Sequence, residues 1–317
     1  MKGTESMTES RGIAFSQGSY VPVDEATIPM LDPAFTKSDV VFDAVSVWDG
    51  SFFRLDDHFA RFRASCDYVR MKPPYTEEEI KEILAHCVDT AGLSRSIVYF
   101  MCTRGRYGGG AAFGDPRTSC NEFHAYAVPY YWVVPKERVE TGAHLWIVET
   151  RRAPNVSINQ RVKSFNRMDL TCGQFEALDN GADQPLLLST EGYLTEGPGF
   201  NVWIVKGDRA RTPGDNVLEG ITRLTVFDLC REIGISTEDA DLKPDDLDDA
   251  DEAFLSTSGG GIIPFTMVNN RSIGGGEPGP VSCRLRDLYW TKRSQGWHAT
   301  PVEKLLATPA PAMVSAT

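Results

Sequence analysis

Residues 39–55, DVVFDAVSVWDGSFFRL, constrain the fold more than any other stretch of this chain. Two runs rich in β-branched and aromatic residues flank Asp49-Gly50, which is a strong signal for a tight β-hairpin turn. A helix should follow, because apolar residues recur at three- and four-residue spacing and Asp56 or Asp57 can cap it. A hairpin joined directly to an amphipathic helix predicts an α+β domain.

A second amphipathic helix and further strands extend this domain. Thr76 and Glu79 have the spacing of a capping box, an apolar helical stripe follows, and Gly92 suits the helix end. Two more β-rich runs lie at 96–103 and 122–129. Residues 1–132 are therefore predicted to form an N-terminal α+β domain.

The second half of the chain alternates β-rich and helical patterns, which is typical of an α/β domain. VVPKERVETG, residues 133–142, loses periodicity and gains charge, so it is the expected linker. The expected strands lie at 145–149, 185–189, 201–206 and 253–256, and the expected helices at 169–179, 222–233 and 281–290. This C-terminal domain should span 143–300, and residues 301–317, rich in Ala, Pro and Thr, are expected to be disordered.

Composition and charge exclude several classes of protein. Of 317 residues, 41% are hydrophobic and 24% charged, as in ordinary soluble proteins. The chain has no apolar run of membrane-spanning length and no signal peptide, so a cytoplasmic protein is expected. Seven cysteines without a C-x-x-C pair argue against a disulfide scaffold and a thiolate zinc site. A net charge of −12 makes nucleic acid a poor partner.

Lys163 lies in the segment INQRVKSFNRMD, between Arg161 and Arg167. Most lysines are exposed surface charges, so this segment alone does not identify a reactive amine. A chemical role for Lys163 depends on partners elsewhere in the chain.

Two glycine-containing stretches could bind an anion. The helix expected to begin near Ile221 and Thr222 has first-turn amides and a positive dipole end that suit a phosphate, and Thr222 can cap it. FLSTSGGGIIP, residues 254–264, offers backbone amides and the hydroxyls of Thr257 and Ser258. Taken alone, the first is better explained as an ordinary capped helix and the second as a flexible turn. Two such stretches in one domain are harder to dismiss.

Two further segments contain the charged groups that a phosphorylated cofactor needs. His58 and Arg61 share one face of a predicted helix, where they could bind a phosphate or simply be polar surface residues. Glu196, in YLTEGPGFNVWIV, precedes an apolar strand, so its carboxylate should be partly buried and need a partner such as a protonated ring nitrogen. A lysine, a carboxylate, an arginine and two stretches that could bind a phosphate together describe a pyridoxal phosphate site.

With these residues in place, the sequence resembles the fold-type IV pyridoxal-phosphate enzymes. This group contains branched-chain and D-amino-acid aminotransferases, aminodeoxychorismate lyases and (R)-selective amine transaminases. The similar segments span residues 52–264 and read FFRLDDHFARF, VKSFN, LTEGPGFNVWIV, EGITRLTVFDL and DEAFLSTSGGGIIP. The resemblance implies two domains with the cofactor at their interface, and a homodimer whose neighbouring subunit partly covers each active site.

The same resemblance implies roles for individual residues. Lys163 stands in the place of the Schiff-base lysine, which also carries the proton, and Glu196 in that of the partner of the pyridine nitrogen. The residues that it places at the phosphate are Arg61, Ile221, Thr222 and either Thr257 or Ser258.

Within the group, FTKSDVVFDAVSVWDGSFFRLDDH is most similar to the (R)-amine transaminases, which implies substrate contacts from Phe42 and Val45. TRGRYGGGAAFGDP occupies the place of a mobile loop whose arginine binds the substrate carboxylate, and both Arg106 and Arg104 are candidates. Met168 stands where the branched-chain enzymes have a tyrosine.

These similarities predict an aminotransferase that moves an amino group between an (R)-amine or D-amino acid and a keto acid such as pyruvate. The expected mechanism is ping-pong. Two alternatives stay open: a branched-chain L-amino-acid aminotransferase, and a pyridoxal-phosphate lyase of the aminodeoxychorismate lyase type.

Overall fold

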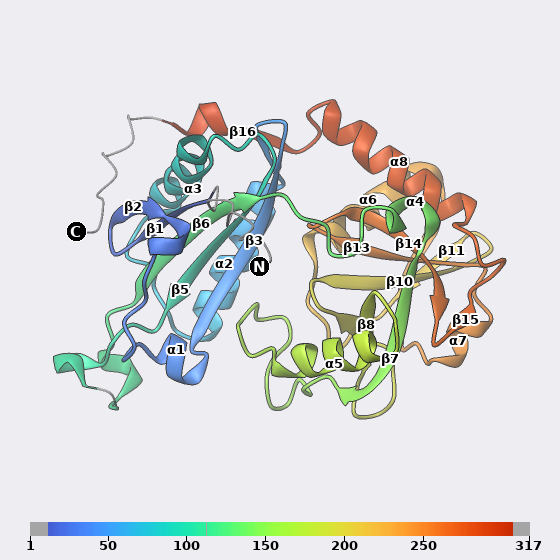
Figure 1. Ribbon diagram of the computed structural model, residues 1–317, viewed down its shortest axis with the longest axis horizontal. Coiled ribbons are helices and arrows are strands. Elements are labelled where there is room, and N and C mark those ends of the chain that lie inside the picture. Colours follow the sequence, from blue (N-terminus) through green and yellow to red (C-terminus); the bar gives the residue numbers. More distant parts are fainter. Residues whose placement is uncertain (1–11, 112, 307–317) are drawn as a thin grey trace, which may run out of the picture. The chain divides into compact units, whose positions relative to one another are not determined.

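The computed structural model describes residues 12–111 and 113–306, which form two compact units (Figure 1). The first unit contains 12–55, 66–130 and 300–306, without residue 112, and the second contains 56–65 and 131–299. The expected linker, 133–142, therefore belongs to the second unit and includes a short helix, α4 (Arg138–Thr141). Residues 56–65, expected in the N-terminal domain, also group with the second unit.

The first unit is built on a seven-stranded sheet with the order β16-β4-β3-β5-β6-β1-β2. Its strands are β1 (Ile13–Ser16), β2 (Ser19–Pro22), β3 (Val40–Trp48), β4 (Ser51–Phe53), β5 (Ser96–Thr103), β6 (Glu122–Pro129) and β16 (Ala299–Pro301). The helices are α1 (Pro33–Lys37) and α3 (Glu77–Ala91), with 3-10 turns η1 (Val23–Glu25), η2 (Gly108–Gly110), η3 (Pro116–Thr118) and η4 (Val302–Leu305). Helix α2 (Leu55–Tyr68) is divided between the units, because its residues 56–65 group with the second. The interior pairs β3–β5 and β5–β6 are antiparallel.

Local sequence signals place several of these elements as expected. Asp49 and Gly50 have φ angles of 49° and 72°, as a two-residue hairpin turn between β3 and β4 requires. The capping box of Thr76 and Glu79 begins α3, and Gly92 ends it in the left-handed conformation. These predictions are confirmed.

Two expectations for this unit are wrong. The helix α2 begins at Leu55, so Asp56 and Asp57 lie inside its first turn and neither occupies the N-cap position; there their charge favours the helix dipole. Residues 301–306 are ordered rather than part of a disordered tail, because β16 joins the sheet and Val302 N donates to Gly50 O at 3.0 Å. The remainder of that expected tail, 307–317, lies outside the described residues.

The second unit contains a nine-stranded mixed sheet with the main order β12-β11-β10-β13-β14-β7-β8, to which β9 and β15 add through β10 and β14. The strands are β7 (Ala143–Arg151), β8 (Gln184–Leu188), β9 (Glu196–Gly197), β10 (Phe200–Lys206), β11 (Arg209–Thr212), β12 (Ser236–Asp239), β13 (Glu252–Thr257), β14 (Gly261–Val268) and β15 (Arg271–Ser272). Besides α4, its helices are α5 (Met168–Asp179), α6 (Ile221–Ile233), α7 (Asp245–Asp248) and α8 (Pro280–Ser294).

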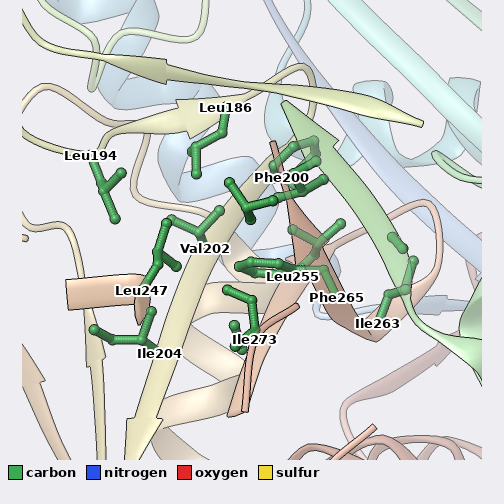
Figure 2. Close-up of a cluster of buried hydrophobic side chains, with 14 of the residues drawn as sticks. Leu186, Leu194, Phe200, Val202, Ile204, Leu247, Leu255, Ile263, Phe265 and Ile273 are labelled. Atoms are coloured by element: carbon green, nitrogen blue, oxygen red, sulfur yellow. The ribbon is translucent and has the colours of Figure 1, made fainter. Parts of the chain in front are cut away.

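The core of the second unit forms where alternate side chains of its central strands meet (Figure 2). Val202, Leu255 and Ile263, from β10, β13 and β14, are fully buried in this cluster. Burying a Val, Leu or Ile side chain stabilises a fold by about 1.5–3 kcal/mol each, so this cluster holds the sheet rigid beneath the residues described next. Among the described residues, no helix has the length and apolar character needed to cross a membrane.

Candidate active site

Lys163 lies in the irregular segment between β7 and α5, and its side chain is buried. Its backbone N–H donates to Ser65 Oγ at 3.2 Å, which ties the segment to α2. The side chain lines a small pocket together with Glu196, and all residues of this pocket belong to the second unit. The lining residues are Arg152, Gln160, Val162, Lys163, Ser164, Asn166, Arg167, Glu196 and Leu218. The amine and the carboxylate selected from the sequence thus share one pocket.

Glu196 begins β9 and is 4% exposed. Arg152 donates to its Oε1 through Nε at 3.2 Å and Nη2 at 3.0 Å, and to Asp169 Oδ2 through Nη1 at 2.6 Å. Burial opposes the charge of Arg152, but the two carboxylates outweigh it and raise the pKa of the guanidinium. The buried charge of Glu196 is therefore compensated from within the protein.

Neither Arg152 nor Asp169 was predicted from the sequence. A signal was available, because a buried carboxylate requires a cationic or hydrogen-bonding partner. That requirement was assigned to a ring nitrogen of the cofactor alone. Glu196 Oε2 has a further donor, since Leu218 N lies 3.0 Å from it.

The first anion cup consists of the N-terminus of α6 and Arg61 of α2. Gly220 precedes the helix and has no side chain, so the amides of Ile221 and Thr222 receive no cap from it. Thr222, expected to cap the helix, is instead buried within its first turn. Arg61 Nη1 donates to Glu219 O at 3.0 Å, beside the turn into α6. Amides, a helix dipole and a guanidinium at one place favour an anion.

The second anion cup lies where β13 turns into β14. Thr257 Oγ1 donates to Gly199 O at 2.8 Å and accepts from Gly259 N at 3.1 Å, so its hydroxyl proton is already used. Ser258 is half-buried beside it. Both hydroxyls stay candidates for contact with an anion. A side chain at Gly261, where φ is +74°, would lie 2.5 Å from Tyr289.

Phe42 and Val45, expected together at the substrate, lie on β3 of the first unit. Three residues apart on a strand, their side chains point to opposite faces of the sheet. Phe42 is 3% exposed and stacks on Tyr99 with ring centroids 6.1 Å apart, and Val45 is completely buried on the other face. A single ligand cannot touch both side chains, so only Phe42 is kept as a candidate.

Arg104 is fixed in place within the first unit. Its Nε and Nη2 donate to Asp39 at 2.9 and 3.0 Å, and its guanidinium also donates to the carbonyls of Val69 and Arg70 at 2.8 and 3.3 Å. A buried arginine with four such bonds is a structural ion pair, which removes it as a mobile substrate-binding residue. Arg106 is exposed and remains the candidate.

The backbone on both sides of Arg106 is anchored. Gly105 has a φ of +69°, and a Cβ there would lie 1.8 Å from Cys120 O. Tyr107 is buried, and its hydroxyl accepts from Lys37 Nζ at 2.9 Å. Movement of Arg106 toward a substrate would therefore be a side-chain movement rather than the swing of a whole loop.

The pocket and cups define a class of protein: an enzyme with a buried amine, a paired carboxylate and anion-binding turns on one α/β unit. The family model described as Amino-transferase class IV matches residues 40–268. The chain belongs to this family and is a pyridoxal-phosphate-dependent aminotransferase, as predicted from the sequence.

Individual relatives agree with the family assignment. The branched-chain-amino-acid aminotransferase of Pseudomonas aeruginosa is 28% identical over 90% of this chain and 94% of its own. The D-alanine aminotransferase of Bacillus licheniformis is 27% identical over 84% of this chain and 91% of its own. The solved T.th. branched-chain amino acid aminotransferase with pyridoxamine 5′-phosphate superposes with a TM-score of 0.84 at 28% identity, covering 92% of this chain and 98% of that one.

Proposed function

We propose that this pyridoxal-phosphate-dependent aminotransferase moves an amino group between an (R)-amine or D-amino acid and a keto acid such as pyruvate. The observation that carries the proposal is the shared pocket of Lys163 and Glu196. One anion cup lies on the turn that follows Leu218, which lines the same pocket.

The residues present fit the cofactor. Lys163 Nζ would hold it covalently, Glu196 would face its ring nitrogen, and Arg61 with the α6 amides would hold its phosphate. Gly220 supports this fit, because a capping side chain would compete for the amides of Ile221 and Thr222. Thr257 or Ser258 would supply a second phosphate contact.

Bound pyridoxal phosphate supplies an electron sink for the carbon that loses a proton. Lys163 Nζ, free of the cofactor as a neutral amine, would take the proton from the α-carbon of the amine donor and deliver it to C4′ of the cofactor, and in the second half-reaction it would move a proton in the opposite direction. Arg167 lines the same pocket, whereas Arg161 is exposed and pairs with Glu219 at 3.2 Å.

Two candidate activities differ in the amine donor that they use. The N-terminal resemblance to (R)-amine transaminases and the similarity to a D-alanine aminotransferase support (R)-amines or D-amino acids. The second candidate is transamination of branched-chain L-amino acids, supported by the bacterial relative and the solved structure with those printed names. Met168, in place of the tyrosine of the branched-chain enzymes, favours the first.

The test uses half-reactions of the holoenzyme with an (R)-arylalkylamine, D-alanine or L-leucine, without any acceptor. Each active donor converts the bound cofactor to its amine form, which changes its absorbance. We expect conversion by the first two donors at rates at least tenfold above that of L-leucine. Faster conversion by L-leucine would establish the branched-chain activity, and no conversion by any donor would contradict both.

A homodimer is also part of the proposal. It is supported by the resemblance and by large apolar side chains that each unit leaves exposed, as expected of surfaces covered by a partner. These side chains include Met30, Phe35 and Phe113 of the first unit, and Met168 and Phe175 of the second.

Arg106 is proposed to bind the carboxylate of the keto acid. Replacing Arg106 with alanine should weaken pyruvate binding at least tenfold, which is about 1.4 kcal/mol, while the amine half-reaction stays nearly unchanged. Arg104→Ala should instead destabilise the fold by about 3 kcal/mol, because it leaves Asp39 and two carbonyls without their donor. Half-reaction kinetics and chemical denaturation distinguish the two. Equal losses in the amine and keto-acid half-reactions of Arg106→Ala would contradict this role for Arg106.

A further inference from the structure

Asn201 contacts two residues that line the proposed site, Glu196 and Leu218, and its side chain faces away from the core. It lies on β10 between Phe200 and Val202, whose side chains belong to the buried cluster (Figure 2), so its own side chain points to the opposite face of the strand. It is 4% exposed. Strand pairing places it opposite Glu196 of β9 on one side and opposite Ser256 of β13 on the other.

The amide of Asn201 holds the turn that carries the α6 N-terminus. Its Nδ2 donates to Leu218 O at 2.8 Å and lies 3.5 Å from Glu196 Oε2. Leu218 N donates to the same Oε2 at 3.0 Å. One buried side-chain amide therefore connects the carboxylate to the turn, and the turn bonds back to the carboxylate.

The other end of the amide explains Gly220. A Cβ at this position would lie 2.2 Å from Asn201 Oδ1, whereas the next contacts, with Arg223 Cβ and Asn201 Cγ, lie at 3.4 Å. The backbone of Gly220 has φ −66° and ψ 138°, which alanine adopts readily. The absence of a side chain at residue 220 is thus imposed by Asn201 and not by the backbone conformation.

We infer that Asn201 is a positioning residue that sets the spacing between the Glu196 carboxylate and the first amides of α6. This inference rests on the function proposed above, in which those two groups hold the ring nitrogen and the phosphate of one cofactor. A ligand held at both ends gains affinity when the protein keeps the two sites at a fixed spacing. A ligand that reaches only one of the sites gains nothing from that spacing.

Binding to the full-length apoenzyme separates positioning from general damage. Asn201→Ala should raise the dissociation constant of pyridoxal phosphate at least tenfold. The dissociation constants of pyridoxal, which lacks the phosphate, and of inorganic phosphate should each rise less than threefold. Absorbance titration measures the first two ligands, and competition against pyridoxal phosphate measures inorganic phosphate. Similar weakening of pyridoxal and pyridoxal phosphate, or no change in either, would overturn the inference. If the wild-type apoenzyme bound no pyridoxal phosphate, the proposed function would fail instead.

A double-mutant cycle tests the contact without any cofactor. Gly220→Ala should lower the thermal midpoint of the wild-type apoenzyme, because its methyl group meets Asn201 Oδ1. In the Asn201→Ala background, Gly220→Ala should lower the thermal midpoint by less than a third as much, since the obstructing oxygen is gone. Gly275→Ala is the matched control, because a Cβ at Gly275 would meet nothing within 4 Å and should show no coupling. Additive losses from Gly220→Ala and Asn201→Ala would contradict the inference. If Gly220→Ala alone does not fold, folding of the double variant supports the inference. If neither the single nor the double variant folds, the inference is overturned.

Discussion

Replacing Lys163 with alanine should reduce amino-group transfer by at least about 10³-fold and leave a folded protein. The rate is lost because the variant has neither the amine that holds the cofactor nor the group that carries the proton. The fold should survive, because the segment keeps the bond from residue 163 N to Ser65 Oγ, which involves only the backbone of residue 163. Steady-state transamination and a denaturation curve measure the two effects.

Covalent attachment gives this prediction an independent readout. Borohydride reduction of the wild-type holoenzyme should add the mass of the cofactor to the peptide that contains Lys163, and Lys163→Ala should show no such adduct. Lys206→Ala is a suitable control, because Lys206 is exposed and makes a surface ion pair with Asp251 at 2.8 Å, a type of contact worth about 0–1 kcal/mol. A reduced adduct that persists in Lys163→Ala would show that another lysine holds the cofactor.

Elements with strong local signals could be predicted from the sequence. The Asp49-Gly50 turn demands two positive φ angles, and the capping box of α3 is satisfied by residues three apart. Both depend on neighbours in the chain. The prediction failed at α2, because Leu55 starts the helix one residue before the aspartates and nothing in the local pattern distinguishes capping from a first-turn carboxylate.

Elements stabilised by distant pairing were missed. β14 (Gly261–Val268) follows a glycine run that was interpreted only as a turn, yet it pairs with β13 and β7 and its residues are mostly buried. β16 (Ala299–Pro301) was not predicted: its first two residues were assigned to the C-terminal domain and Pro301 to a disordered tail, because Ala-Thr-Pro has little strand propensity without the sheet that it joins. Tertiary contacts decide such segments.

In the candidate site, too, some residues could be selected from the local sequence and others only from the fold. Lys163 and Glu196 could be selected from residue type and flanking sequence, and they do share a pocket. Arg152 could not, because RRAPN contains two adjacent arginines and only the fold shows which one points inward to Glu196. Arg104 was expected to be mobile because it precedes a glycine-rich stretch, but its partner Asp39 lies far away in sequence.

Glu196→Gln is expected to slow proton transfer by about 10²-fold or more while the cofactor stays bound. The exchange preserves the shape of the side chain but removes the negative charge proposed to hold a proton on the ring nitrogen. Phosphate contacts and Lys163 are unaffected, so cofactor affinity should fall little. Stopped-flow absorbance of the amine half-reaction measures the rate, and titration of the apoenzyme measures the affinity.

The ion pairs of Arg152 with Glu196 and Asp169 predict how much folding stability Glu196→Gln loses. In Glu196→Gln, Arg152 keeps its 2.6 Å bond to Asp169, so the loss should be about 1–3 kcal/mol of folding free energy. Arg152→Met, in contrast, leaves the buried Glu196 and the half-buried Asp169 without a cation and should cost about 3–5 kcal/mol. Glu191→Gln, at an exposed carboxylate nearby, is the matched control and should change neither rate nor stability measurably. Near-normal turnover in Glu196→Gln would mean that the charge of Glu196 serves only to pair Arg152. A slow but stable variant would separate its chemical role from that structural one.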